Sequence, residues 1–151
     1  MKDIDWVSQN PEKYGKRLIF EAEQLKASYP LFGFHIDNRE LFVEGPLITR
    51  SNNVYLARAY YPSNYPYSPP SPIITDRDVV DFCNTYGMHN FHNYGTFRDV
   101  GIKLCVMKPD DVIGEGWKLN YSVVTIINYM ALWLHAYEYK KEKGIWLLPE
   151  A

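Results

Sequence analysis

The stretch that decides the fold is Tyr61–Thr75, which reads YPSNYPYSPPSPIIT and holds five prolines between Pro62 and Pro72. Proline has no backbone N–H, so it cannot donate a hydrogen bond to a sheet ladder. The stretch therefore predicts a rigid, extended connection in which tyrosine rings pack against proline faces. Its last three residues, Ile73 to Thr75, favour β-structure and predict a short fourth strand.

Three short β-rich runs precede this connection, at residues 32–36 (FGFHI), 41–49 (LFVEGPLIT) and 53–61 (NVYLARAYY). In the third run, Val54, Leu56 and Arg58 alternate with Tyr55, Ala57 and Ala59, as expected of a half-buried strand. The turns between the runs are short, and parallel neighbours would need a long crossover. With residues 73–75, the runs predict a four-stranded antiparallel meander.

One helix is expected on each side of these strands. Asn10-Pro11 supplies a capping side chain and a proline at the first helical position, and Tyr29-Pro30 ends that helix. Near the C-terminus, Ser122 can cap a helix that Gly144 ends. Its apolar face comprises Val123, Ile127, Met130, Leu134 and Tyr137. The order of helix, antiparallel strands, long loop and helix predicts an α+β fold, with residues 1–151 as a single domain.

Length and charge exclude several classes of function. The chain has 151 residues, 16 basic and 18 acidic side chains and a net charge of −2, so nothing indicates binding to a nucleic-acid backbone. No apolar run approaches the roughly 20 residues that span a bilayer. Residues 1–15 lack the apolar core of a signal peptide. We therefore expect a cytoplasmic protein with no nucleic-acid or membrane partner.

The chain has two cysteines, Cys83 and Cys105. In a reducing compartment free thiols are expected, and the spacing of the two residues does not fit a zinc site. Cys83 follows the apolar residues Val79 and Val80, which suits a buried thiol. Cys105 has two interpretations, a small buried hydrophobic residue or a nucleophile.

The order of motifs around the proline-rich stretch resembles that of the ubiquitin-conjugating enzymes, which have the UBC fold. Their third strand runs into a similar aromatic-proline, tyrosine-proline and proline-proline series, seen here at residues 60–62, 65–67 and 69–70. Glu44-Gly45-Pro46 is similar to the glycine-proline turn of their second strand. The resemblance covers residues 11–146 and implies that Cys105 is the catalytic cysteine that forms a thioester. Residues 76–120, which lack sustained periodicity, would then form a long active-site loop.

Conjugating enzymes place a His-Pro-Asn motif before the cysteine, and its asparagine stabilises an oxyanion. This chain offers His89-Asn90 and His92-Asn93 instead, without the proline, and Asn93 is twelve residues before Cys105. The resemblance makes all four residues catalytic candidates, with a histidine as base or hydrogen-bond partner. The alternative is that both His-Asn pairs form turns through side-chain to backbone hydrogen bonds.

Two acidic residues after the cysteine, Asp110 and Asp111, are candidates for deprotonating an attacking amine; the alternative is a solvated turn. Leu104-Cys105, this acidic loop, Trp117 and the last helix resemble the stand-alone conjugating-enzyme-like proteins of bacterial CBASS operons. Those operons defend against phage through cyclic-oligonucleotide signalling. The matching positions, which are mostly expected core residues, are Thr125, Ile126, Trp133, Leu134, Tyr137, Glu138, Gly144 and Trp146.

This closer resemblance implies an acyl transferase of anti-phage defence. Cys105 would form a thioester with the C-terminus of a protein, either the operon's nucleotidyltransferase (CD-NTase) or a ubiquitin-like protein, and pass it to an acceptor. Whether a separate activating enzyme loads Cys105 is left open, and no metal or nucleotide cofactor is expected. One alternative is a non-catalytic UBC-fold adaptor that binds the same partners. Another is a structural α+β protein with an incidental thiol.

Overall fold

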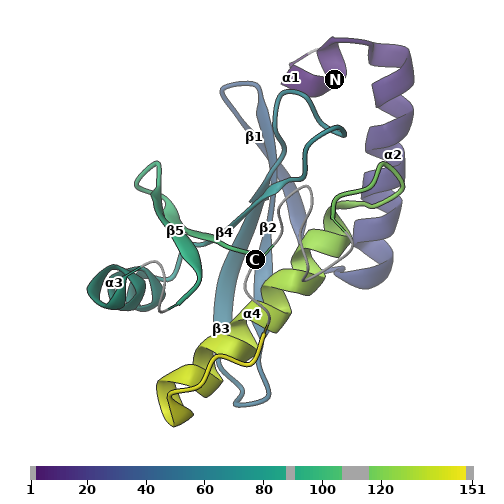
Figure 1. Cartoon of the computed structure of the whole chain (residues 1–151). Coiled ribbons are helices and arrows are strands. Elements are labelled where there is room, and N and C mark those ends of the chain that lie inside the picture. Colours follow the sequence, from purple (N-terminus) through teal and green to yellow (C-terminus); the bar gives the residue numbers. More distant parts are fainter. Residues whose placement is uncertain (1–2, 88–90, 107–115, 149–151) are drawn as a thin grey trace.

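The computed structural model describes residues 3–87, 91–106 and 116–148. These residues form one antiparallel sheet of six strands, in the order β1-β2-β3-β4-β6-β5, with α4 across one face and α2 beside it (Figure 1). The elements in chain order are α1 (Asp5–Ser8), α2 (Pro11–Ser28), β1 (Gly33–Asp37), β2 (Glu40–Ile48), β3 (Val54–Tyr60), β4 (Ser71–Ile74), α3 (Arg77–Tyr86), β5 (Asn93–Phe97), β6 (Gly101–Leu104) and α4 (Val123–Lys143). The predicted α+β fold is confirmed.

The meander predicted from the three runs and residues 73–75 corresponds to β1–β4, which pair antiparallel in sequence order. The alternation predicted for β3 is also present: Ala57 and Ala59 are fully buried, whereas Val54 and Leu56 are exposed. Gly45 and its neighbour Pro46 lie inside β2 and not in a turn. A Cβ atom at Gly45 would lie 2.4 Å from the Phe32 ring, so the glycine makes room for that ring.

The segment predicted as a long irregular loop, residues 76–120, contains α3 and the β5–β6 hairpin, so the sheet has two strands more than the four predicted. Helix α3 buries Val79, Val80 and Cys83, which are spaced as one face of a single short helix. Strand β6 inserts beside β4, where Ile74 pairs with Ile102. In the sequence, an apolar helix face of only two or three helical turns is too short to stand out from the polar residues around it.

Both predicted helices begin and end at the expected residues. The Asn10 side chain accepts a hydrogen bond from the Lys13 amide, and α2 ends immediately before Tyr29. The Ser122 side chain accepts from Val124 N at the start of α4, and Gly144 closes the helix in the left-handed conformation. The predicted apolar face of α4 is buried against the sheet, together with Ile126 and Trp133. These end signals explain why the helix boundaries could be predicted.

Two tyrosines of the proline-rich stretch pack on Trp6 of α1. Tyr61 stacks on Trp6 with ring centroids 5.7 Å apart, and Tyr65 meets the same ring edge-on at 5.0 Å. Trp117 donates from Nε1 to the Pro66 carbonyl at 2.7 Å. The connection is therefore held by aromatic contacts with the N-terminal residues and with the segment that leads into α4.

A buried carboxylate joins α2 to the start of α4. Glu21 is fully buried and accepts hydrogen bonds from Tyr61 Oη at 2.9 Å and from Val123 N at 2.8 Å. Arg17, one helical turn earlier, lies 3.3 Å from the second carboxylate oxygen and also donates to the carbonyls of Leu119 and Tyr121. Burial raises the pKa of Glu21 above its ordinary value. This network fixes where α4 begins relative to α2.

A second carboxylate, Glu138, ties the far end of α4 to the β2–β3 turn. Its Oε2 atom accepts from Thr49 at 2.9 Å, Asn53 at 2.7 Å and Tyr55 at 2.6 Å. Burial acts to raise the pKa of Glu138, but these hydrogen bonds outweigh it and hold the pKa below its ordinary value. Helix α4 is thus anchored to its neighbours at both ends.

Candidate functional site

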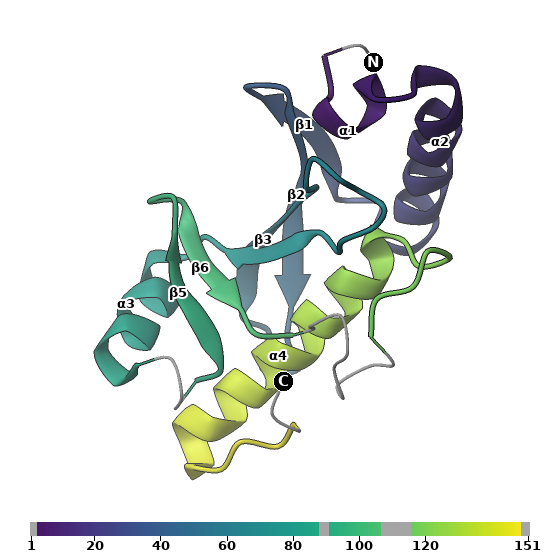
Figure 2. The ribbon, with the colours of Figure 1, turned by 45° about the horizontal axis from the view of Figure 1, so that its top comes forward.

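Cys105 follows directly after β6, where the chain leaves the sheet beside α4 (Figure 2). Its backbone N–H donates to the His92 carbonyl at 2.9 Å. The same carbonyl oxygen accepts a hydrogen bond from Trp133 Nε1 of α4, also at 2.9 Å. One backbone oxygen therefore fixes the cysteine to the β5–β6 hairpin and to the C-terminal helix.

The sulfur of Cys105 lies next to a tyrosine hydroxyl. Its thiol donates to Tyr94 Oη across 3.4 Å. Tyr94 belongs to β5 and is 45% exposed, whereas Cys105 is 8% exposed. The Lys103 ammonium lies 5.7 Å from the centroid of the Tyr94 ring. A thiol at the end of a strand thus lies beside a partly accessible phenol, and a cation lies over the ring of that phenol.

The two cysteines have different surroundings, although both are buried and they are not joined in a disulfide. Cys83 lies on α3 and belongs to the main hydrophobic core, and burial raises its pKa to about 12. Among the described residues, that core cluster includes the neighbours Leu104 and Val106 but not Cys105. Cys83 is therefore the buried core thiol that its apolar sequence context predicted, and Cys105 is the cysteine beside a polar group.

Asn93, a predicted catalytic residue, uses its side chain to shape a turn. Its Oδ1 accepts from Gly95 N at 2.8 Å, and its Nδ2 donates to the Phe91 carbonyl at 3.3 Å. The residue is 5% exposed and sits where the register of the hairpin shifts. These are the bonds that the turn interpretation predicted, and an oxyanion role for Asn93 stays a prediction.

His92 is placed by its ring as well as by its carbonyl. The imidazole stacks on Trp146, with ring centroids 4.6 Å apart, and Trp146 also meets Trp133 edge-on at 5.8 Å. The φ angle of His92 is +36°, an uncommon value for a residue other than glycine. The segment after α4 therefore packs on the same residue that holds the Cys105 backbone.

The remaining predicted site residues, His89, Asn90, Asp110 and Asp111, lie outside the described residues. Their relation to Cys105 stays a prediction. Two groups that sequence reasoning missed are Tyr94 and the indole N–H of Trp133, which had only been expected in the core. The signal for Tyr94 would have been the β5–β6 hairpin itself, because the antiparallel pairing of Asn93 with Leu104 makes Tyr94 and Cys105 diagonal neighbours across the two strands.

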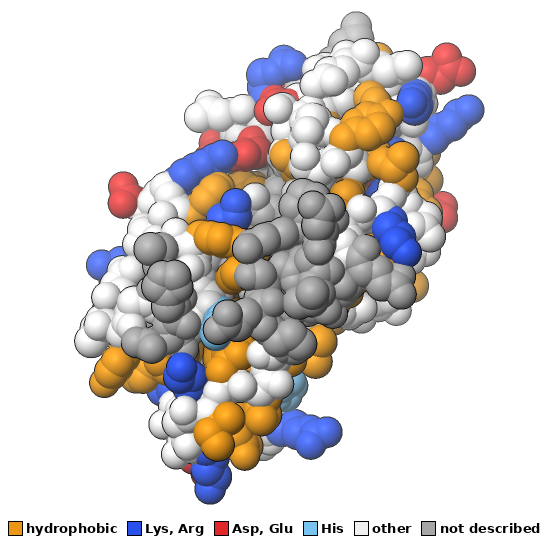
Figure 3. Space-filling view, in the orientation of Figure 1, with side chains coloured by type: hydrophobic (Ala, Val, Ile, Leu, Met, Phe, Trp, Pro, Cys, Tyr) orange, Lys and Arg blue, Asp and Glu red, His pale blue; other side chains and the backbone are white. Residues whose placement is uncertain are grey.

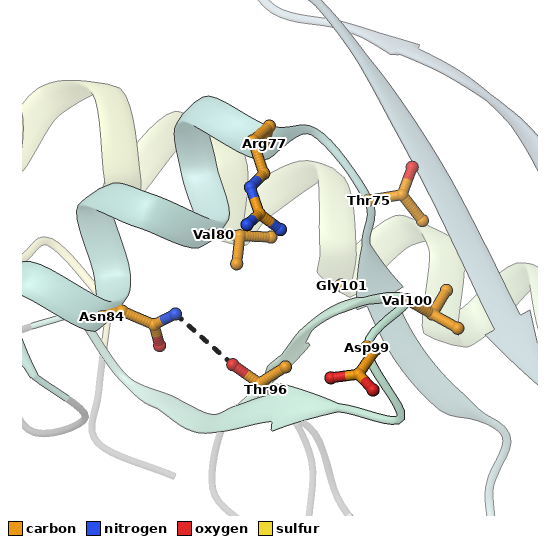
Figure 4. Close-up of a pocket in the computed structure, with 8 residues that line it drawn as sticks. All are labelled: Thr75, Arg77, Val80, Asn84, Thr96, Asp99, Val100 and Gly101. Carbon is orange, nitrogen blue, oxygen red and sulfur yellow. Dashed lines mark hydrogen bonds between the residues drawn. The ribbon is translucent and has the colours of Figure 1, made fainter.

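A separate polar pocket of about 230 Å³ lies between α3 and the β5–β6 hairpin (Figure 4). Across it, Asn84 Nδ2 lies 3.4 Å from Thr96 Oγ1. Cys105 is not among its lining residues, which are Thr75, Arg77, Val80, Asn84, Thr96, Asp99, Val100 and Gly101. The pocket is therefore distinct from the candidate site.

The face shown in Figure 3 carries basic and acidic side chains interspersed, in keeping with the near-neutral composition. Hydrophobic side chains gather where α4 ends, and there Ile145 and Leu147 are more than half exposed. In the described part of the chain, no group of three or more His, Cys, Asp or Glu residues is placed to hold a metal ion. No helix among the described residues is long and apolar enough to cross a membrane.

This arrangement of an N-terminal helix, an antiparallel sheet and a C-terminal helix is consistent with the fold of a conjugating enzyme. A family model described as Type II CBASS E2 protein matches residues 21–151, and the chain belongs to this family. No curated protein matches the chain. The family assigns it a conjugating-enzyme-like role in CBASS defence, with protein partners from such an operon.

Proposed function

We propose that Cys105 carries an acyl group as a thioester with the C-terminus of a protein partner and passes it to an acceptor. The partner that we favour is the nucleotidyltransferase of a CBASS operon, because the chain belongs to a CBASS family, and a ubiquitin-like protein is the alternative. The observation that carries the proposal is the setting of Cys105, at the end of β6, beside a phenol, with its amide held by His92.

Cysteine suits such a carrier because thiolates are strong nucleophiles and thioesters react readily with amines. In the loading step, the Cys105 thiolate attacks the carbonyl carbon of a thioester on another protein. A new carbon–sulfur bond forms, and the donor leaves as a thiolate. In the transfer step, an acceptor amine attacks the same carbon, its proton passes to solvent, and Cys105 leaves as a thiolate.

The test is to isolate the tagged chain from cells that express a complete operon, under acidic and non-reducing conditions. Intact mass should show an adduct equal to the partner minus one water, which thiol reductants release. Cys105→Ala should abolish the adduct, and Cys105→Ser should convert it to an oxyester that resists reductants. Cys83→Ala is the matched control and should retain the adduct, because Cys83 lies in the core.

An adduct that survives Cys105→Ala would contradict the assignment. A partner that co-purifies equally with the wild type and with Cys105→Ala, without any adduct, would instead favour a non-catalytic adaptor. One observation favours this second candidate. The side-chain amide of Asn93 is engaged in a turn and not in the oxyanion role that an asparagine has in conjugating enzymes.

A further inference from the structure

We propose that Tyr94 is a catalytic residue whose phenol donates a hydrogen bond to the Cys105 sulfur whenever that sulfur is a thiolate. The inference rests on the proposed thioester function and names a group that acts in it. The distance between Tyr94 Oη and Cys105 Sγ is 3.4 Å, within the range of hydrogen bonds to sulfur. With a neutral thiol, the sulfur donates and the phenol accepts. A thiolate has no proton to donate, so the hydroxyl rotates and donates instead.

The hairpin holds this phenol in place. Asn93 pairs with Leu104 across the two strands, and its side chain accepts from Gly95 N on the far side of Tyr94. Tyr94 is thereby fixed between two residues whose backbones are constrained. In this proposal Asn93 is a positioning residue, which acts on the sulfur through its neighbour and not through an oxyanion.

Charge and exposure support the same role. The Lys103 ammonium lies 5.7 Å from the centre of the Tyr94 ring. A cation at this position withdraws electron density from the ring and makes the phenol a better donor. Tyr94 is 45% exposed, so an acyl group attached to Cys105 can lie against it without displacing the core.

The hydrogen bond would serve both steps of the reaction. During loading it stabilises the Cys105 thiolate that attacks the incoming thioester carbonyl. During transfer the carbon–sulfur bond breaks, and the electron pair that returns to the sulfur meets the phenol O–H. Tyr94 gives up no proton in either step, because it donates a hydrogen bond and retains its hydrogen. Catalysis of this kind depends on a donor already aimed at the atom where charge develops.

The first test measures alkylation of Cys105 by iodoacetamide between pH 6 and pH 10, with each cysteine quantified by peptide mass spectrometry. Tyr94→Phe keeps the ring and removes only the hydroxyl. It should slow alkylation about three- to tenfold at pH 7, the factor that corresponds to the net contribution of an ordinary hydrogen bond. The rate at pH 10 should change little. Tyr139→Phe, at an exposed tyrosine of α4, is the control and should follow the wild type.

Two further measurements keep the proposal falsifiable. Asn93→Ala should shift the pH profile in the same direction as Tyr94→Phe, and the two changes together should shift it no further. Adduct formation in cells that express the operon should fall in Tyr94→Phe by a factor similar to that seen in alkylation. Identical alkylation profiles for wild type and Tyr94→Phe, or equal adduct formation despite a shifted profile, would overturn the role. If even the wild type forms no adduct, the proposed function fails, while alkylation still reports the contact.

Discussion

Replacing the buried carboxylate of Glu21 should destabilise the protein substantially. Glu21→Ala removes the acceptor for Tyr61 Oη and Val123 N and leaves both donors without their partner. A hydrogen bond to a charged group contributes about 1.5–3 kcal/mol, and breaking a buried ion pair costs about 3–5 kcal/mol. Arg17 retains the Leu119 and Tyr121 carbonyls, which places the expected cost near 3 kcal/mol. For a chain of this size, the melting temperature should fall by about 6–12 °C.

The assay is urea unfolding followed by tryptophan fluorescence, with Glu23→Ala as the matched control. Glu23 lies on the same helix but is exposed, so its replacement should change the free energy of unfolding by less than about 0.5 kcal/mol. Tyr61→Phe removes one of the bonds to Glu21, so it should couple to Glu21→Ala in a double-mutant cycle. Additive effects of the two changes, or a cost for Glu21→Ala no larger than that for Glu23→Ala, would refute the reasoning.

The pH dependence of this cost has a defined sign. Burial raises the pKa of Glu21 in the folded protein. The part of its contribution to stability that depends on protonation is therefore complete below the unfolded-state pKa and is lost as the pH rises through the folded-state pKa. Glu21→Ala should consequently cost more near pH 4 than near pH 8. A cost that instead grows with pH would show that the carboxylate is stabilised in its charged form.

The other two predictions concern the far end of α4 and the contact of β6 with β4. Glu138 has a lowered pKa, so its contribution is present above the unfolded-state pKa and is lost as the pH falls through the folded-state value. Glu138→Gln should therefore lower the free energy of unfolding at pH 7, and urea titrations should show the difference shrinking below pH 4; a constant difference would contradict this. Gly101→Ala should cost about 1–3 kcal/mol or more, because its Cβ would lie 2.3 Å from the Ile74 carbonyl oxygen. Gly33→Ala is the control in the same unfolding assay, since its Cβ meets nothing closer than 3.8 Å, and equal costs would refute the steric argument.

Much of the fold could be predicted because its signals are local. The caps of α2 and α4, the alternation in β3 and the prolines before β4 each state a backbone preference within a few residues. Helix α3 and the β5–β6 hairpin have no comparable local signal. Their stability comes from contacts with the sheet, including the pairing of Ile74 with Ile102, and such contacts are not visible in a single sequence.

The candidate site divides in the same way. Cys105 is a candidate because the order of motifs before it is similar to that of a known family, and its catalytic role stays a prediction; the burial of Cys83 could be predicted from its apolar neighbours. The placement of Tyr94, His92 and Trp133 around Cys105 could not be predicted. They depend on a hairpin register and on one carbonyl oxygen that receives donors from two distant segments.

The strand order has a consequence for how another polypeptide can reach Cys105. Strand β6 lies between β4 and β5, so the backbone that leads to Cys105 has a hydrogen-bonded neighbour on each side. An extended tail can therefore add to this sheet as a new strand at β1 or at β5, but not beside β6. Residue Tyr94 lies on β5, so a tail that docked on that outer edge would pass the phenol before it met the sulfur.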